Sequence, residues 1–237
     1  MQIFISPAKQ MKPCDDFVAN SQPWFQQEAD QLIERLSSYS IDALKKLYAC
    51  SEAISKKAYD MIHSYAQAPV YPALFYFSGI QYTYMAPDVF TNQEMEYIRT
   101  HLRIGSGLYG ILRPMDGIKA YRLEMNQKPG INLYDFWKNK LAQTFDDPVI
   151  LNLASAEYAK SISKYCPMID VRFYEQVGDQ RKEKGVHVKM ARGRMVRYMA
   201  EHQVEQIEQL YDFDELGFHF DPQTSTKQTL IYVKGGS

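Results

Sequence analysis

The stretch LRIGSGLYGILRPMDGIKAYRLEM, residues 102–125, decides the fold that the sequence predicts. Three of its glycines, Gly105, Gly107 and Gly110, lie close together between two apolar runs. Glycine allows a sharp turn, or lets another group approach the backbone closely. We therefore expect a turn at these glycines, with a helix resuming near Leu108 that presents free backbone N–H groups.

Free N–H groups at the start of a helix form a site for phosphate or carboxylate. The same stretch supplies positive charge around the turn, in Arg103, Arg113, Lys119 and Arg122. The residues by themselves therefore predict an anion-binding turn.

The helix that leads into this turn has the clearest start signal in the chain. Thr91 followed three residues later by Glu94 fits a capping box, which predicts a helix from Thr91 to Leu102. Ser40 and Ser51 are expected to cap two earlier helices in the same way.

Short apolar runs predict strands at Gln2–Ile5, Ala73–Phe77, Val149–Leu153 and Ile169–Val177. Helices and strands are mixed without strict alternation. We therefore predict one α+β (mixed α/β) domain over residues 1–237, with a central mixed sheet and surrounding helices. The terminal Gly235–Ser237 segment is set aside as a remnant of cloning.

Polar residues are expected at the carboxyl ends of two of these strands. Lys9 follows the first strand after a proline turn, and loops at such places often carry function. The strand Val149–Leu153 is followed by small residues and a helix start, a geometry that displays polar side chains at the edge of a sheet. The side chains there are Asn152, Ser155, Glu157 and Lys160.

A second basic segment, KMARGRMVR at residues 189–197, begins a long helix that is predicted to run to about Gln209. Cations at a helix N-terminus oppose the helix dipole. A negative group should therefore compensate the four cations Lys189, Arg192, Arg194 and Arg197, either a buried carboxylate or a ligand.

Composition restricts the function classes. The chain has 237 residues, 46% hydrophobic and 23% charged, which predicts a real core. Its 27 basic and 28 acidic residues give a net charge of −1, so a nucleic-acid partner requires the cations to gather on one face. Three separated cysteines without a CxxC pair, and no signal peptide or long apolar window, predict a cytoplasmic protein without a membrane partner.

Common cofactor and metal motifs are absent from the sequence. The five histidines show no ligand spacing, so we expect no metal site and no cofactor. The GxGxxG pattern at 105–110 follows a predicted helix rather than a strand, which argues against a dinucleotide site. The remaining polar set has two interpretations, a buried ion-pair network around Glu124 and Glu157, or a cationic cleft for a phosphate-bearing partner. The set comprises Lys9, Arg113, Arg122, Glu124, Asn152, Ser155, Glu157, Lys160, Lys189, Arg192 and Arg197.

Six motifs in order along the chain resemble the YaaA peroxide-stress protein family. They are ISPAK (5–9), HLRIGSGLYGILRPMD (101–116), YRLEM (121–125), LYDFW (133–137), NLASAEYAK (152–160) and KMARGRMVR (189–197). The resemblance implies a cytosolic bacterial protein that limits hydrogen peroxide damage linked to unincorporated iron. It also implies an unusual mixed α/β topology with a helix–hairpin–helix element and a positively charged cleft that binds DNA.

Carried onto this sequence, the resemblance places the helix–hairpin–helix element at about 92–114. DNA is then the expected partner, held without sequence specificity through phosphates, and a small anionic ligand is a further expected partner. The expected phosphate contacts are Gly105, Gly107, Gly110, Arg103, Arg113, Arg122, Lys160, Lys189, Arg192 and Arg197.

Two other functions stay open. The first is an enzyme acting on a phosphorylated or nucleobase-containing small molecule, with Lys9, Ser155, Glu157 and Lys189 as candidate catalytic residues. Lys9 or Lys189 would hold the anion, and Glu157 would be the general acid or base. The second is direct iron binding through carboxylates such as Glu124 and Glu157.

Overall fold

Strand β1 (Gln2–Ile5) lies at the centre of the sheet, and all four of its residues are buried. Its neighbours β5 (Leu102–Ser106) and β8 (Ile150–Leu153) run parallel to it and are also completely buried. Parallel strands covered on both faces read as continuous apolar runs, which is why β1 and β8 were recognisable as strands, whereas β5, interrupted by Arg103 and Gly105, was not. The structure is a computed structural model that describes residues 1–235, so the last two residues of the proposed cloning remnant lie outside the described part.

Eight strands form the main sheet, a mixed sheet that confirms the predicted α+β class. Its order is β11-β12-β9-β8-β1-β5-β6, with β10 paired to β9. The flanking strands are β6 (Gly110–Leu112), β9 (Ile169–Val177), β10 (Gln180–Lys182), β11 (Phe218–Phe220) and β12 (Thr229–Lys234). Small two-stranded pairs join β2 (Gln10–Met11) to β4 (Phe77–Ser78) and β3 (Tyr71–Pro72) to β7 (Gly117–Ile118).

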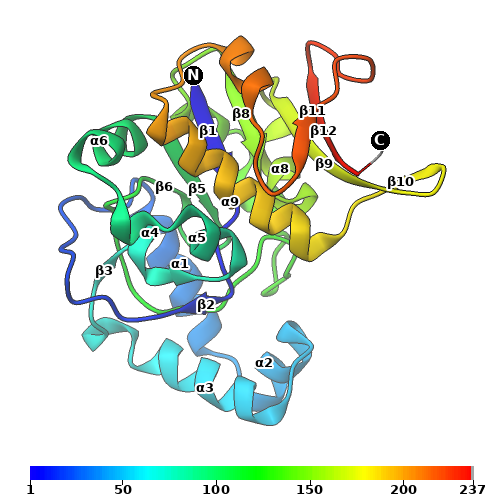
Figure 1. Cartoon of the computed structure of the whole chain (residues 1–237). Helices are drawn as coiled ribbons and strands as arrows, with labels where there is room; N and C mark the ends of the chain where they lie inside the picture. The colour runs from blue at the N-terminus through cyan, green and yellow to red at the C-terminus, as the bar shows by residue number, and fades with distance from the viewer. Residues whose placement is uncertain (236–237) are drawn as a thin grey trace.

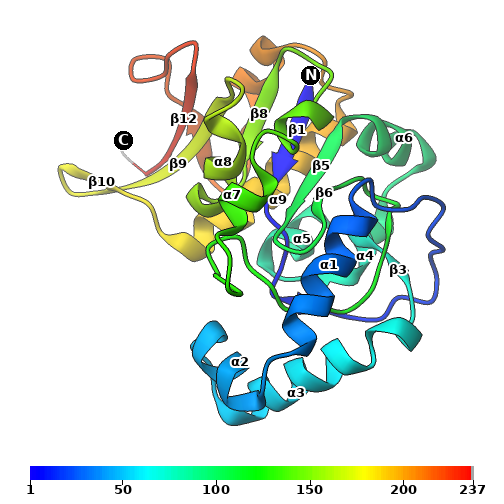
Figure 2. The same cartoon turned by 180° about the vertical axis from the view of Figure 1, so that it is seen from behind.

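Helices cover both faces of this sheet (Figures 1 and 2). One face carries α5 (Ile80–Met85), α6 (Asn92–His101) and α9 (Gly185–Glu201). The other carries α1 (Gln26–Ser37), α7 (Leu133–Trp137) and α8 (Ala156–Ser163). The helices α2 (Ile41–Tyr48) and α3 (Glu52–His63) project together from the lower end of the molecule, away from the sheet.

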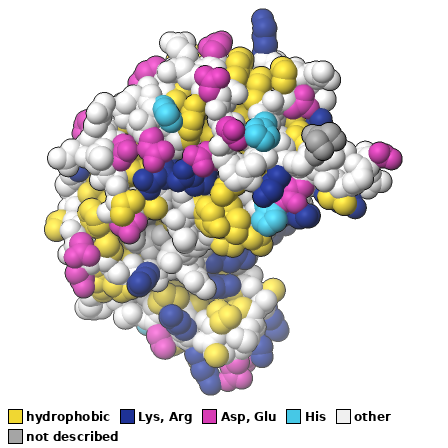
Figure 3. All heavy atoms as spheres, viewed as in Figure 1, with side chains coloured by type: hydrophobic (Ala, Val, Ile, Leu, Met, Phe, Trp, Pro, Cys, Tyr) yellow, Lys and Arg dark blue, Asp and Glu magenta, His cyan; other side chains and the backbone are white. Residues whose placement is uncertain are grey.

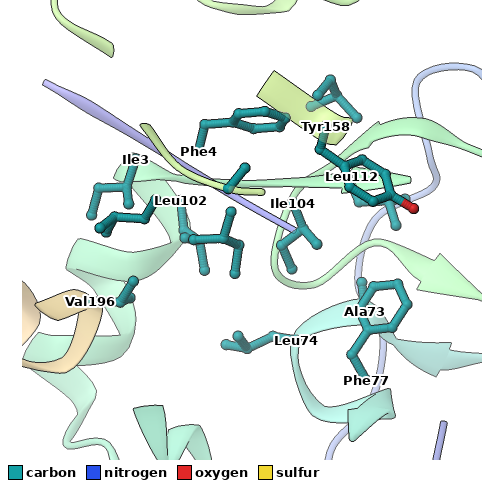
Figure 4. Packing of buried hydrophobic residues seen from close by; sticks show 14 of the residues in the cluster. Ile3, Phe4, Ala73, Leu74, Phe77, Leu102, Ile104, Leu112, Tyr158 and Val196 are labelled. Atoms are coloured by element: carbon teal, nitrogen blue, oxygen red, sulfur yellow. The ribbon is translucent and has the colours of Figure 1, made fainter. Parts of the chain in front are cut away.

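The core lies on both sides of the sheet, as Figure 4 shows, with Phe4 and Tyr158 on one side and Leu74 and Val196 on the other. These four side chains are at most 5% exposed. Two covered faces leave the ends of the strands as the places where polar side chains gather.

The predicted helix caps are present. The side chain of Ser51 accepts a hydrogen bond from the backbone N–H of Ile54, and Ser40 caps α2 in the same way. Thr91 and Glu94 form a complete capping box at the start of α6. Local hydrogen bonding of this kind depends on residues three apart, which is why it can be read from sequence.

The prediction of a helix–hairpin–helix element at 92–114 is wrong, because no helix follows the glycine turn. After α6 the chain forms an antiparallel β-hairpin, β5 with β6, in which Ile104 pairs with Leu112. A short apolar run does not distinguish helix from strand by its periodicity. Pairing with β1 satisfies the backbone of β5, and a positive φ of 72° at Gly110 shapes the turn.

Two other expectations also need correction. Residues Ala73–Tyr76 form the short helix α4 rather than a strand, and only Phe77–Ser78 are extended. The long basic helix α9 begins before Lys189, at Gly185, and ends at Glu201 instead of running to about Gln209. A left-handed residue at Gln203 and the 3-10 helix at Ile207–Asp212 follow it.

Helix α9 packs against α5 through Gly193. A Cβ atom at position 193 would overlap the backbone carbonyl oxygen of Gln81 and lie 3.0 Å from the backbone nitrogen of Met85. Only glycine permits so close a contact between a helix and a neighbouring backbone. This contact sets the position of Arg192, on α9, relative to Gln81, on α5.

Replacing Gly193 by alanine is expected to lower the free energy of unfolding by about 1–3 kcal/mol, because the overlap with α5 outweighs the helix preference of alanine. Urea denaturation measures the change. Gly185→Ala is the matched control, since its Cβ would meet no atom within 4 Å. That variant should be unchanged or up to about 1 kcal/mol more stable. Equal stability of the two variants would contradict the packing described.

Candidate functional site

A cavity of about 510 Å³ opens where β1 and β8 end. Ser6 follows β1 and Ser155 follows β8, and both line the cavity. The backbone N–H of Ser155 donates to the Ser6 hydroxyl oxygen at 2.8 Å, which ties the two strand ends together. The carboxyl ends of parallel strands are the usual place for ligands in such sheets, so this cavity is the candidate site.

The cavity collects ionisable side chains from segments far apart in the sequence. Four are cations and two are carboxylates, which leaves a formal charge of +2. They are Lys9, Arg122, Glu124, Glu157, Lys189 and Arg192. All four candidate catalytic residues, Lys9, Ser155, Glu157 and Lys189, are thus brought to one cavity.

The segment Tyr121–Met125 reaches the cavity because of the β5–β6 hairpin. A Cβ at Gly107 would overlap the backbone carbonyl oxygen of Leu123, so the two backbones lie in direct contact. The hydroxyls of Ser106 and Tyr121 are hydrogen-bonded at 2.7 Å. The glycine stretch therefore contributes to the site indirectly, by holding the segment that supplies Arg122 and Glu124.

Arg122 and Arg192 are far apart in the sequence, but both line the cavity and share one property. The Nε of each guanidinium is buried and has no hydrogen-bond partner within residues 1–235. Burial lowers the pKa of the Arg192 guanidinium. The side-chain amide nitrogen of Gln81, a residue only 7% exposed, is likewise buried and unpartnered in the described chain.

Buried donors without acceptors are costly, by about 1–3 kcal/mol each and more for charged groups. Three such groups lining one cavity, Gln81, Arg122 and Arg192, indicate that a ligand supplies the acceptors. Sequence reasoning missed Gln81, because nothing in its local pattern distinguishes it from an ordinary helix residue.

The carboxylates are arranged differently. Lys9 forms an ion pair with Glu124 at 2.9 Å. Glu157 accepts a hydrogen bond from the backbone N–H of Asn126 at 3.0 Å. Burial raises the pKa of Glu157, and the nearby charge of Glu124 raises it further, while the Asn126 N–H and Lys9 oppose this shift. The raised pKa makes Glu157 the better placed of the two carboxylates for a role as general acid or base.

A buried ion-pair network does not account for the cations. Of the described residues, Glu124 pairs only with Lys9, and Arg122, Lys189 and Arg192 form no ion pair. The geometry is that of a cationic cleft.

The structure places several other predicted residues away from the cavity. Arg113 pairs with the fully buried Asp116 at 2.7 Å and stacks on Trp24. Arg103 is 7% exposed and donates to the carbonyl oxygen of Thr100. Arg113 is thus held by an internal partner, whereas the Nε of Arg103, like those of Arg122 and Arg192, is buried without a partner in the described chain.

Three further polar residues also lie away from the cavity. Arg197 pairs with Glu201 at 2.6 Å. Asn152 donates to Asp170 at 2.8 Å, and Lys160 lies over the ring of Tyr134 in a separate surface hollow. Gly105, Gly107 and Gly110 are buried in the hairpin.

Nothing in the described residues forms a three-ligand metal cluster of histidine, cysteine, aspartate or glutamate. Glu124 and Glu157 lie at one cavity, but their neighbours there are cations, which oppose a metal ion. No helix within residues 1–235 is both long and apolar enough to cross a bilayer.

Glu157→Gln is expected to stabilise the protein at neutral pH. The folded state raises the pKa of Glu157, so the wild type loses stability as pH rises from about 4.3, the ordinary glutamate value, through the raised value. The glutamine keeps an oxygen for the Asn126 N–H and removes the charge. Urea denaturation from pH 4 to 8 should show a difference that is largest at neutral pH and vanishes in acid. A difference independent of pH would contradict this account.

Comparisons with known proteins agree with the motifs. The family model described as peroxide stress protein YaaA matches residues 1–224. A UPF0246 protein of Desulfitobacterium hafniense is 42% identical, over 99% of this chain and 98% of its own. UPF0246 proteins of Lachnoclostridium phytofermentans and Lacticaseibacillus paracasei are each 41% identical over at least 98% of both chains. The chain therefore belongs to the YaaA family of peroxide stress proteins.

Proposed function

We propose that this peroxide stress protein binds DNA in the cytoplasm through phosphates, without reading sequence, and so limits oxidative damage linked to free iron. The observation that carries the proposal is the cationic cavity, in which Arg122, Lys189 and Arg192 have no carboxylate partner among the described residues. Membership of the family supports the role in peroxide stress.

The projecting helices α2 and α3 extend the cationic surface beyond the cavity. They form a tight helical hairpin, in which Ala49 adopts a left-handed conformation with φ of 44° and Ser51 caps α3. The N–H groups of Ala49 and Cys50 are bonded within the turn, so the N–H groups at the start of α3 are those proposed to contact phosphate, a contact that does not depend on sequence. In the proposal, α2 and α3 make the phosphate contacts that the sequence analysis expected from residues 92–114.

Lysines on the hairpin are exposed, and Figure 3 shows lysine and arginine side chains over the lower projection and along the hollow above it. They include Lys45, Lys46, Lys56 and Lys57. The guanidinium of Arg122 lies 5.6 Å from the ring centroid of Tyr48, at the end of α2. The hairpin and the cavity therefore belong to one surface that a duplex backbone can follow.

Protein cations that neutralise DNA phosphates release the counterions condensed there. Ferrous iron held on DNA is one such counterion, and hydroxyl radicals formed from it react where they arise. Displacing iron from the phosphates in this way would link DNA binding to peroxide resistance without a metal site in the protein.

A second candidate function is an enzyme acting on a phosphorylated or nucleobase-containing small molecule in the same cavity. The enclosure of Gln81, Arg122 and Arg192 favours it, because an extended DNA backbone reaches buried donors less easily than a small molecule does. Lys189 would hold the anion, and Glu157 would be the general acid or base.

DNA affinity should fall steeply with salt and be equal for unrelated duplexes, because phosphates supply the contacts. The double variant Lys46→Gln/Lys57→Gln should weaken binding to both sequences alike and make the salt slope shallower by about 1 for each cation that touches phosphate. Fluorescence anisotropy of labelled duplexes at several salt concentrations measures both quantities. Lys227→Gln, a change of an exposed lysine outside this surface, is the control. Affinity that does not change with salt would contradict the proposal.

A further inference from the structure

We infer that the cavity at the ends of β1 and β8 binds the phosphomonoester of a nucleotide, with Arg122 and Arg192 on the phosphate and Gln81 on the base. This inference deepens the proposed nucleic-acid function and rests on it for the class of ligand. The phosphomonoester belongs either to a free mononucleotide or to the phosphorylated end of a DNA strand.

Charge favours a phosphomonoester over a singly charged group. The ionisable side chains lining the cavity leave a formal charge of +2. A phosphomonoester carries a charge of about −1.5 to −2 at neutral pH, whereas a carboxylate or an internal phosphodiester carries −1. The terminal group of a nucleotide therefore neutralises this cavity most completely.

The unpartnered donors match the same ligand. Arginine donates in a planar fork that fits phosphate oxygens, and the Nε atoms of Arg122 and Arg192 lack acceptors within the described chain. Gln81 offers its amide to the edge of an uncharged ring, as glutamine does with a base. The enclosed position of these atoms means that water does not easily satisfy them.

Helix α8 adds a third element to the phosphate side of the cavity. Ser155 precedes its eight residues and lines the cavity, but the serine side chain makes no capping hydrogen bond. The first N–H groups of α8 thus have no side-chain cap, and they lie at the positive end of the helix dipole next to a residue that lines the cavity.

Size and lining fit the rest of a nucleotide. A volume of about 510 Å³ lies within the usual range of small-molecule sites, about 300–1,000 Å³. Pro7, Ile80 and Leu123 supply apolar surface, and the rings of Tyr82 and Tyr121 also line the cavity. Bases stack on aromatic rings with little dependence on their identity.

Titration of the full chain with AMP and with adenosine, followed by calorimetry, tests the phosphate contact. AMP should bind at least about tenfold more tightly than adenosine, as expected for loss of charge-assisted hydrogen bonds. Arg192→Gln should weaken AMP binding by a similar factor. Arg99→Gln, which alters an exposed arginine on α6, should leave it unchanged.

A second variant, Ser155→Asp, tests the phosphate site without relying on the folding of Arg192→Gln. Aspartate is as good an N-cap as serine, so α8 should stay intact while a negative charge enters the phosphate site. AMP affinity should fall at least about tenfold with no loss of thermal stability. Thr91→Asp makes the matching change at the N-cap of α6 and should not affect AMP binding.

Three DNA probes distinguish the two sources of the phosphomonoester. They are a duplex with 5′-phosphate ends, the same duplex with 5′-hydroxyl ends, and a covalently closed circle. A preference for AMP over adenosine supports a free mononucleotide, and a preference only for phosphorylated ends supports a strand end.

Equal binding of AMP and adenosine, together with equal binding of the two duplexes, overturns the inference. AMP binding unaffected by both Arg192→Gln and Ser155→Asp overturns it as well. Salt-dependent binding of the closed circle would then still support the proposed DNA function. Conversely, AMP binding without any affinity for the circle would refute DNA backbone binding and retain the nucleotide site.

Discussion

The site depends on a contact that only a residue without a side chain permits, between the backbone at Gly107 and the backbone of Leu123. This contact presses the segment Tyr121–Met125 onto the end of the β5–β6 hairpin and aims Arg122 at the cavity. Gly193 does the corresponding work on the other side, where α9 lies against α5 and carries Arg192 beside Gln81. Two close backbone contacts thus bring cations from distant parts of the chain into one hollow.

These two contacts hold buried hydrogen-bond donors in place for which the described chain supplies no acceptors. Several arginines outside the cavity have carboxylate partners, as Arg113 has Asp116 and Arg194 has Glu215 at 2.5 Å. In the cavity, the side chains of Arg122 and Arg192 are partly buried, and their buried Nε atoms have no hydrogen-bond partner in the described chain. The folded chain bears the cost of these unpaired donors, and an anion bound in the cavity would relieve it. The proposed function, phosphate binding by a peroxide stress protein, rests on this arrangement.

Sequence reasoning succeeded where a signal is local or set by strand polarity. Thr91 with Glu94 defined the start of α6, and the ends of two apolar runs placed Lys9 and Ser155 at one site. It failed at the short apolar run Leu108–Leu112, whose periodicity fits a helix or a strand. The predicted helix does not form, and Gly110–Leu112 pairs with β5. The glycines correctly indicated a close approach to the backbone, but what approaches Gly107 is the segment Tyr121–Met125 of the same chain and not a ligand. The partner of Arg113 and the role of Gln81 depend on tertiary contacts that no spacing encodes.

The central claim is that the Nε–H groups of Arg122 and Arg192 donate hydrogen bonds to a bound anion. The most direct measurement is the ¹⁵N–¹H NMR signal of each arginine Nε–H group during a titration with AMP, with Arg113 as the internal reference. The account predicts that the signals of Arg122 and Arg192 shift and become protected from exchange with water, while that of Arg113, already paired with Asp116, stays in place. Signals of Arg122 and Arg192 that remain unchanged at saturating AMP would contradict it.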